Sequence, residues 1–216
     1  MVQRTKVMAE LTFYTNPMSR GRIVRWMLEE TGVEYATEPL DYAGSMKAAP
    51  YRAINPMGKV PAIRHGQRVV TESAAICAYL ADVFPQAELA PSAGERAAYY
   101  RWLFFAAGPL EQAMTHHALG FTPSEEQSRM LGYGTHELTT EVLADALNGQ
   151  SYLAGDRFTA VDVYAGSQVI WGLRTGTLVD QPAFTAYADR LSARDAFQRA
   201  SRIDDALLDR AEPPPT

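Results

Sequence analysis

The sequence has a single cysteine, no long hydrophobic run and no cluster of basic residues, and each shortage excludes a class of protein. With Cys77 alone, no disulfide can form within the chain, which suits a reducing cytoplasm. No apolar run reaches the ~18 residues of a membrane span. Gln3, Arg4, Lys6 and Glu10 interrupt the first ten residues, so we expect no signal peptide. The net charge of −5, without a basic stretch, argues against a nucleic-acid partner.

The length of 216 residues suits one or two domains with a real core. Strand and helix signals alternate in the first part, with Gly32 as a helix C-terminal residue. The expected elements are a strand over Leu11–Tyr14, a helix over Ser19–Thr31, a strand over Glu34–Leu40, a short helix over Lys47–Ile54, a hairpin after Val60 and a helix over Ser73–Phe84. This βαβ plus ββα order is thioredoxin-like.

Beyond Pro85–Gly94 the strand signal disappears, and this break in composition is typical of a linker. Apolar spacing predicts helices over Glu95–His117, Ser124–Leu147, Ala160–Leu173, Pro182–Ala193 and Asp195–Leu208. We therefore expect an α/β domain over 10–85, a linker over 86–94 and an all-α domain over 95–211. A proline-rich tail follows at 212–216.

The most informative stretch is Asn55-Pro-Met-Gly-Lys-Val-Pro-Ala-Ile-Arg-His-Gly-Gln-Arg-Val-Val-Thr-Glu-Ser73. Proline is confined to strand starts, edges or bulges, so Val60, before Pro61, is expected at an unpaired edge whose backbone can pair with a peptide-like ligand. Ser73 at a helix start offers its hydroxyl and free N–H groups to a carboxylate. Glu72 beside it suits an ammonium group. Together they fit a small zwitterionic peptide.

This segment resembles the glutathione-binding half of the cytosolic glutathione transferases, and the resemblance spans nearly the whole chain after residue 10. It implies a cis Val60–Pro61 bond, a backbone pairing of Val60 with the cysteinyl part of glutathione, and capture of the γ-glutamyl end by Glu72 and Ser73. Lys59 belongs to the same expected glutathione-binding set. The alternative is that Val60-Pro61 belongs to an ordinary edge strand and that Glu72-Ser73 is an ordinary helix cap. For either element alone this alternative is preferred, but their ordered combination favours the glutathione site.

The resemblance also implies two candidates for holding the glutathione sulfur. Tyr14 falls where tyrosine-type members carry their hydroxyl, and Ser19 where serine-type and bacterial cysteine-type members carry theirs. The absence of cysteine at position 19 argues against a mixed disulfide with the protein. A helix N-terminus, with Arg20 and Arg22 nearby, lowers the pKa of a thiol. Ser19 as a plain N-cap, and the arginines as a solvated helix face, are the alternatives.

The wall of the electrophile pocket is less legible, and we expect it to include Met18, Phe105, Glu111 and Trp171. The resemblance places Trp171 where some bacterial members border the active-site cleft, although core packing is its preferred role. Cys77 lies in the apolar pattern after Ser73 and is expected to be an inert buried thiol.

A capping box is expected at Thr159 and Asp162, with a role in folding. His116 and His117 are adjacent on a helix and point different ways, and no spacing of His, Cys and acidic residues suggests a metal.

The expected activity is attack of glutathione thiolate on a small apolar electrophile, with glutathione as co-substrate and no metal. A glutathione-dependent peroxidase or disulfide reductase would use the same cleft, and a non-catalytic interaction module would use the same scaffold. An isomerase is disfavoured because the Ser-Ser-Cys start of its first helix is absent. The resemblance further implies a cytoplasmic homodimer.

Overall fold

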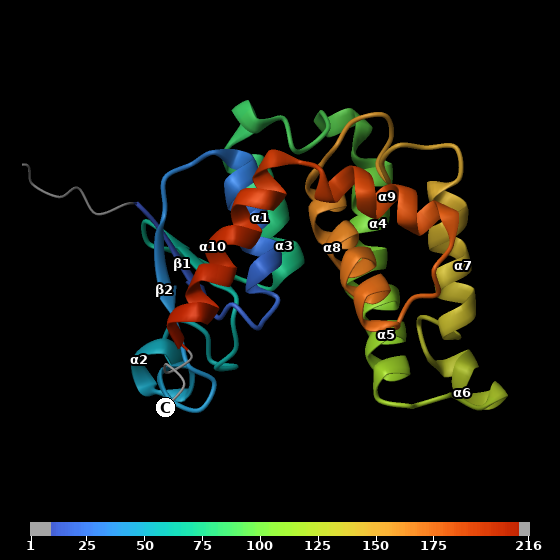
Figure 1. Cartoon of the computed structure of the whole chain (residues 1–216), viewed down its shortest axis with the longest axis horizontal. Helices are drawn as coiled ribbons and strands as arrows, with labels where there is room; N and C mark the ends of the chain where they lie inside the picture. The colour runs from blue at the N-terminus through green and yellow to red at the C-terminus, as the bar shows by residue number, and fades with distance from the viewer. Residues whose placement is uncertain (1–9, 212–216) are drawn as a thin grey trace, which may run out of the picture.

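The structure is a computed structural model that describes residues 10–211, and Figure 1 shows its two side-by-side parts. A sheet with helices packed on it forms one part, and a bundle of helices forms the other. Residues 1–9, where we expected no signal peptide, lie outside the described residues, and so does the proline-rich tail at 212–216.

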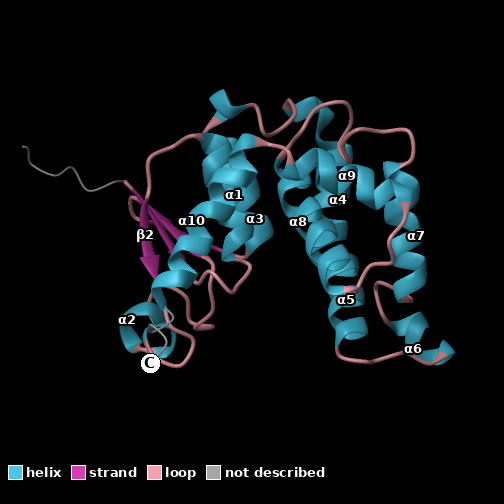
Figure 2. Cartoon of the chain, viewed as in Figure 1, coloured by secondary structure: helices cyan, strands magenta, loops and turns pink. Residues whose placement is uncertain are grey.

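The sheet has four strands in the order β2-β1-β3-β4, and all of them come from the first part of the chain (Figure 2). The central strands pair antiparallel, with Phe13 of β1 opposite Ile63 of β3, whereas β1 and β2 are parallel. The strands are β1 Leu11–Thr15, β2 Ala36–Pro39, β3 Ala62–His65 and β4 Arg68–Thr71. The mixed sheet with its β-α-β-β order confirms the thioredoxin-like fold.

Successive residues of β1 point to opposite faces of the sheet, and this alternation separates two apolar cores. Leu11 and Phe13 join the large core beneath α1 (Gly21–Thr31) and α3 (Ser73–Val83). Tyr14 instead joins a small cluster with Tyr51 of α2 (Ala49–Arg52) on the other face. A 3₁₀ turn at Ser45–Lys47 precedes α2, so the expected helix over Lys47–Ile54 is shorter than predicted.

The second part is all helical, as expected from its sequence. Its helices are α4 Arg96–Phe105, α5 Glu111–Ala118, α6 Glu125–Met130, α7 His136–Leu147, α8 Ala160–Thr175, α9 Pro182–Ser192 and α10 Asp195–Ala211. A π-helical turn at Ala106–Leu110, which contains Pro109, joins α4 to α5. None of the described helices combines the length and apolarity needed to cross a bilayer.

The single helix predicted over Ser124–Leu147 is wrong, because the chain breaks between α6 and α7. Gly134 has a φ of +68°, which a helix interior does not allow. The Thr135 hydroxyl then accepts the N–H of Leu138 and starts α7 anew. None of the α6 residues is buried, so the apolar spacing that ran across this break did not mark one buried helix face.

Two folding predictions are confirmed. Thr159 and Asp162 form the capping box of α8, and the Asp162 carboxylate also accepts the N–H of Leu153 and the hydroxyl of Tyr187. Cys77 is fully buried in α3, and burial raises the pKa of its thiol far above neutrality. The thiol is therefore protonated and shielded, as expected of a structural cysteine.

The C-terminal helix α10 leaves the bundle and packs along α1 on the sheet side (Figure 1). Arg25 of α1 and Asp204 of α10 form a buried ion pair with a Nε–Oδ1 distance of 3.1 Å. Phe197 of α10 meets the Trp26 ring edge-on, with centroids 5.0 Å apart. The last helix thus completes the core of the first part of the chain.

Candidate functional site

The loop between β1 and α1 carries Ser19, and Asn16 organises it. The side chain of Asn16 donates to the carbonyl oxygen of Leu40 at 2.8 Å and accepts the N–H of Met18 at 2.9 Å. The backbone carbonyl oxygen of Asn16 accepts the N–H of Ser19 at 3.0 Å. The sequence indicated a turn at Asn16-Pro17 but did not predict that Asn16 holds the loop. An asparagine in a turn often hydrogen-bonds the backbone two residues later, and this tendency could have predicted its bond to Met18.

Ser19 lies in the turn before α1, which begins at Gly21 rather than at Ser19. Its hydroxyl donates to the carbonyl oxygen of Asn16 at 2.6 Å and accepts the N–H of Gly21 at 2.9 Å. The side chain is half-buried. Its oxygen therefore lies at the start of α1, at the positive end of the helix dipole, although the N–H groups of Gly21, Arg22 and Ile23 already have partners within the loop.

Tyr14 points to the opposite face of the sheet from the large core and is 6% exposed. Its ring lies 5.6 Å from that of Tyr51, centroid to centroid, inside the small cluster on the α2 side. Ser19, in contrast, lies on the loop beyond the end of the strand. Of the two candidates for holding the sulfur, Tyr14 is thus buried in an apolar cluster, whereas Ser19 is half-buried on a loop.

The peptide bond between Val60 and Pro61 is cis, as expected. Val60 is not on an edge strand, because β3 lies between β1 and β4; it precedes β3, which begins at Ala62. Within residues 10–211 its backbone forms no hydrogen bond to another backbone group. Its pairing groups are thus open, as predicted, but for a different reason.

The residue before it, Lys59, has its carbonyl oxygen held by two side chains. The hydroxyl of Tyr51 and the amide of Asn55 both donate to it at 2.7 Å. Burial raises the pKa of Tyr51 to about 12, so at neutral pH its hydroxyl carries the proton that this bond needs. The Lys59 side chain itself is exposed. The most informative stretch of the sequence begins at Asn55, but it did not predict this role for Asn55 or for Tyr51.

Glu72 and Ser73 form the start of α3. Ser73 is the first residue of the helix and is 8% exposed. Glu72 is exposed and has a φ of +65°, a backbone conformation that costs free energy in a residue with a side chain. A strained backbone persists only where the surrounding structure holds it in place, and such residues cluster at binding and active sites.

Of the expected wall residues, Met18 is 75% exposed beside Ser19, and Glu111 of α5 forms an ion pair with Arg20. Phe105 is half-buried and meets the ring of Trp102 edge-on, at a centroid distance of 5.2 Å. Core packing of Trp171 is wrong: this side chain is 57% exposed.

The sequence did not indicate Tyr164 and Gln168, which share a face of α8 with Trp171 by their spacing. Gln168 donates to the carbonyl oxygen of Ala106 in the π turn at 3.1 Å. Burial raises the pKa of Tyr164, and the Glu111 carboxylate raises it further. This face of α8 therefore lies near the ion pair that joins Glu111 to the Ser19 loop.

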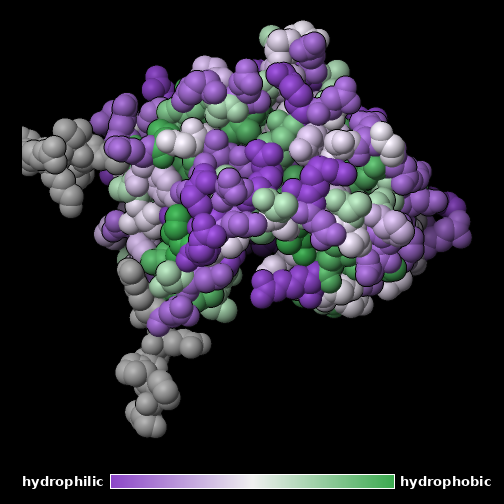
Figure 3. All heavy atoms as spheres, turned by 45° about the horizontal axis from the view of Figure 1, so that its top comes forward, coloured by the Kyte–Doolittle hydropathy of each residue, from purple (hydrophilic) through white to green (hydrophobic). Residues whose placement is uncertain are grey.

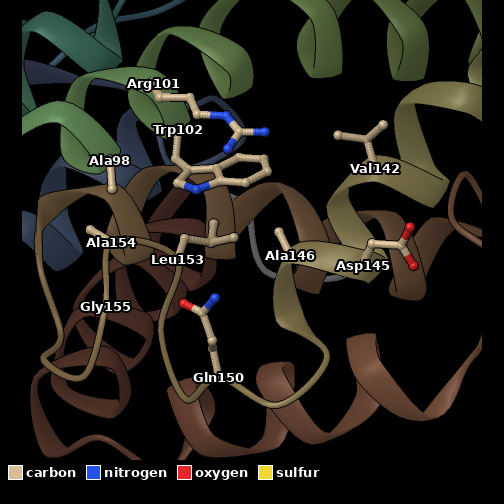
Figure 4. Close-up of a pocket in the computed structure, with 10 residues that line it drawn as sticks. All are labelled: Ala98, Arg101, Trp102, Val142, Asp145, Ala146, Gln150, Leu153, Ala154 and Gly155. Atoms are coloured by element: carbon tan, nitrogen blue, oxygen red, sulfur yellow. The ribbon is translucent and has the colours of Figure 1, made fainter.

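A separate hollow of about 480 Å³ lies within the helical part, and none of the expected site residues lines it (Figure 4). Its lining residues come from α4, α7 and the segment before α8: Ala98, Arg101, Trp102, Val142, Asp145, Ala146, Gln150, Leu153, Ala154 and Gly155. Among residues 10–211, no group of three or more His, Cys, Asp or Glu side chains is arranged to hold a metal ion.

Residues 18–83 match the family described as "Glutathione S-transferase, N-terminal domain". The chain is 32% identical to glutathione S-transferase GST-4.5 of Xanthomonas campestris pv. campestris, across 90% of this chain and 98% of that protein. It is 30% identical to maleylacetoacetate isomerase of Pseudomonas aeruginosa, across 88% and 93%.

Among solved structures, the theta class glutathione S-transferase of Xanthomonas axonopodis pv. citri with glutathione bound aligns with a TM-score of 0.72 at 29% identity. The alignment covers 90% of this chain and 98% of that one. Sequence and fold agree over nearly the full length of these proteins. The chain therefore belongs to the cytosolic glutathione S-transferase family and is an enzyme of that family.

Proposed function

We propose that this glutathione S-transferase binds glutathione along Val60, Glu72 and Ser73 and directs its thiolate at small apolar electrophiles. The observation that carries the proposal is the strained backbone of Glu72 directly before the first turn of α3. The free N–H groups of this turn suit a carboxylate, and the exposed Glu72 carboxylate suits an ammonium group. Lys59, Val60 and Pro61 supply the neighbouring backbone segment, in which Val60 has no backbone partner among the described residues.

In the proposed reaction, the glutathione thiol loses its proton to solvent, and the start of α1 stabilises the sulfur anion. Ser19 contributes by rotating its O–H from the carbonyl oxygen of Asn16 to the sulfur, a motion about one bond. The sulfur then forms a bond to the electrophilic carbon, and the leaving group departs with the electron pair. Tyr14 is the second candidate for this role, although its ring packs among Tyr51 and the small cluster.

Two other reactions are open to the same thiolate. Attack on the O–O bond of a peroxide or the S–S bond of a disulfide would give peroxidase or reductase activity. The Pseudomonas relative is named as an isomerase, but the Ser-Ser-Cys pattern expected at the start of α1 is absent here.

The proposal includes a homodimer in the cytoplasm and domains bounded at 10–85 and 95–211. Support for a dimer comes from exposed apolar side chains: Phe104 is 71% exposed, Tyr100 one turn earlier on α4 is 45% exposed, and Val69 on β4 is 43% exposed. On the face shown in Figure 3, hydrophobic residues form small patches among mostly hydrophilic ones. Burial of these side chains against a second copy would remove them from water.

The test combines calorimetry with a parallel assay. We expect glutathione to bind, and Ser73→Ala to weaken binding by roughly 1–3 kcal/mol, the scale of a lost charged hydrogen bond. Ser128→Ala, on the distant helix α6, is the control. Purified protein is then given glutathione with an aryl halide, an organic peroxide or a small disulfide. Binding without turnover in all three assays would contradict the proposed attack of the thiolate on these electrophiles.

A further inference from the structure

An ion pair joins the two parts of the chain beside Ser19. Arg20, in the turn before α1, pairs through Nη2 with Oε1 of Glu111 at the start of α5, 91 residues away. The side chains are 58% and 27% exposed, so the pair is reachable from solvent. Because Arg20 directly follows Ser19, its positive charge can interact electrostatically with an anion bound at Ser19.

This pair differs from the other ion pairs that reach α1. Among the described residues, Arg22, Arg25, Glu29 and Glu30 of α1 all pair with residues of α10 or with Arg194, the residue just before it. Those pairs fasten the C-terminal helix to the sheet side. Only Arg20 reaches across to α5, where Glu111 follows the π turn.

Glu111 has little other compensation for its negative charge. The chain runs from the π turn into α5 without leaving the helical conformation, so no free helix N-terminus lies at Glu111. The Glu111 charge acts on Tyr164 of α8, and burial keeps this tyrosine in the neutral form. The Glu111 charge is therefore matched by Arg20.

We propose that Glu111 is a specificity-determining residue, because its carboxylate cancels the charge of Arg20 beside the glutathione sulfur and so removes a preference for anionic electrophiles. The inference rests on the proposed transferase function. With both charges present, a carboxylate on the electrophile meets attraction and repulsion together. Without Glu111, Arg20 attracts that carboxylate and favours the thiolate form of bound glutathione as well.

The test compares two electrophiles of nearly equal shape, 4-chloro-3-nitrobenzoate and 4-chloro-3-nitrobenzamide. We expect Glu111→Gln to raise the ratio of kcat/KM for the acid over the amide by about three- to tenfold, the size expected of one uncompensated charge at a partly exposed site. Arg20→Gln should lower the same ratio. The double variant should return close to the wild-type ratio, since the effect depends on the pair.

Glu125→Gln is the control, because Glu125 also pairs with an arginine, Arg129, but within the single helix α6 and with both side chains more exposed than those of Arg20 and Glu111. It should leave the ratio unchanged. An unchanged ratio in Glu111→Gln, in an enzyme that still turns over the amide, would overturn the inference while leaving the transferase function intact. Failure of the wild-type protein to use any electrophile would instead refute the proposed function.

A second readout separates a charge effect from a loss of shape. Ultraviolet titration of bound glutathione should show a lower thiol pKa in Glu111→Gln and a higher one in Arg20→Gln. A structural disturbance would shift both variants in the same direction, and that result would also count against the assignment.

Discussion

The hydroxyl of Ser19 donates its one proton to the carbonyl oxygen of Asn16, at an Oγ–O distance of 2.6 Å. The Oγ atom of Ser19 also accepts the N–H of Gly21 at 2.9 Å. A hydroxyl has a single proton, so a bond to a ligand sulfur requires that Ser19 release Asn16. Because Asn16 is itself held by Leu40 and Met18, the loop can stay in place while only the hydroxyl turns.

The first prediction separates Ser19 from Tyr14. Loss of a hydrogen bond to a charged acceptor costs roughly 1.5–3 kcal/mol, or about one to two pKa units of the acceptor. Ser19→Ala should therefore raise the pKa of bound glutathione by that amount, whereas Tyr14→Phe should not. Thiolate absorbance followed against pH measures both. A raised pKa in Tyr14→Phe alone would assign the role to Tyr14.

The second prediction concerns the strained backbone at Glu72. Glycine adopts its φ of +65° without penalty, so Glu72→Gly should raise the free energy of unfolding by about 1 kcal/mol and weaken glutathione binding. Glu88→Gly is the matched control, because Glu88 has a φ of +54° and lies in the expected linker. It should show a smaller stability gain, because its ψ of 33° places it in the left-handed helical region, with unchanged affinity. Denaturant unfolding and calorimetry give the two quantities.

Local patterns predicted the elements that local chemistry determines. The hairpin, the start of α3 at Ser73 and the capping box of Thr159 depend on neighbours within a few residues, and all were predictable from sequence. Pairs between distant residues were not. Arg25 meets Asp204 across 179 residues, and no periodicity encodes which charged side chains will meet. The break at Gly134 was hidden because glycine alone does not say whether φ is positive.

The third prediction tests how tightly the Ser19 loop is packed. A Cβ atom on Gly21 would lie 2.0 Å from Thr15 Oγ1 and 3.0 Å from Ser19 Oγ. Gly21→Ala should shift this loop, lower the free energy of unfolding by about 1–3 kcal/mol and reduce kcat. Gly94→Ala, whose Cβ would meet nothing within 4 Å, should do neither. Equal effects of the two substitutions would contradict the close packing.

The fourth prediction concerns the buried pair of Arg25 and Asp204. Asp204→Ala removes both the counterion and the hydrogen-bond acceptor of Arg25, so the free energy of unfolding should fall by about 3–5 kcal/mol at neutral pH. Asp205→Ala is the control, because Asp205 is 62% exposed in its pair with Arg22. A loss below 1 kcal/mol is expected there.

The fifth prediction is a pH dependence of the same residue. Burial raises the pKa of Asp204, although Arg25 opposes the shift. The folded state therefore keeps this proton at pH values where the unfolded chain has lost it. The Asp204 contribution to stability should fall as pH rises from about 4 through the folded pKa. Urea unfolding at a series of pH values should show this component in the wild type and its absence in Asp204→Asn.

The position of α10 has a consequence for synthesis on the ribosome. Arg25 emerges early, but its buried counterion Asp204 follows 179 residues later. Phe197, which covers the Trp26 ring, is also made near the end. A nascent chain that stops after the sheet would hold an unmatched arginine and an uncovered indole on α1. The part of the enzyme that is translated first is thus the part that is finished last.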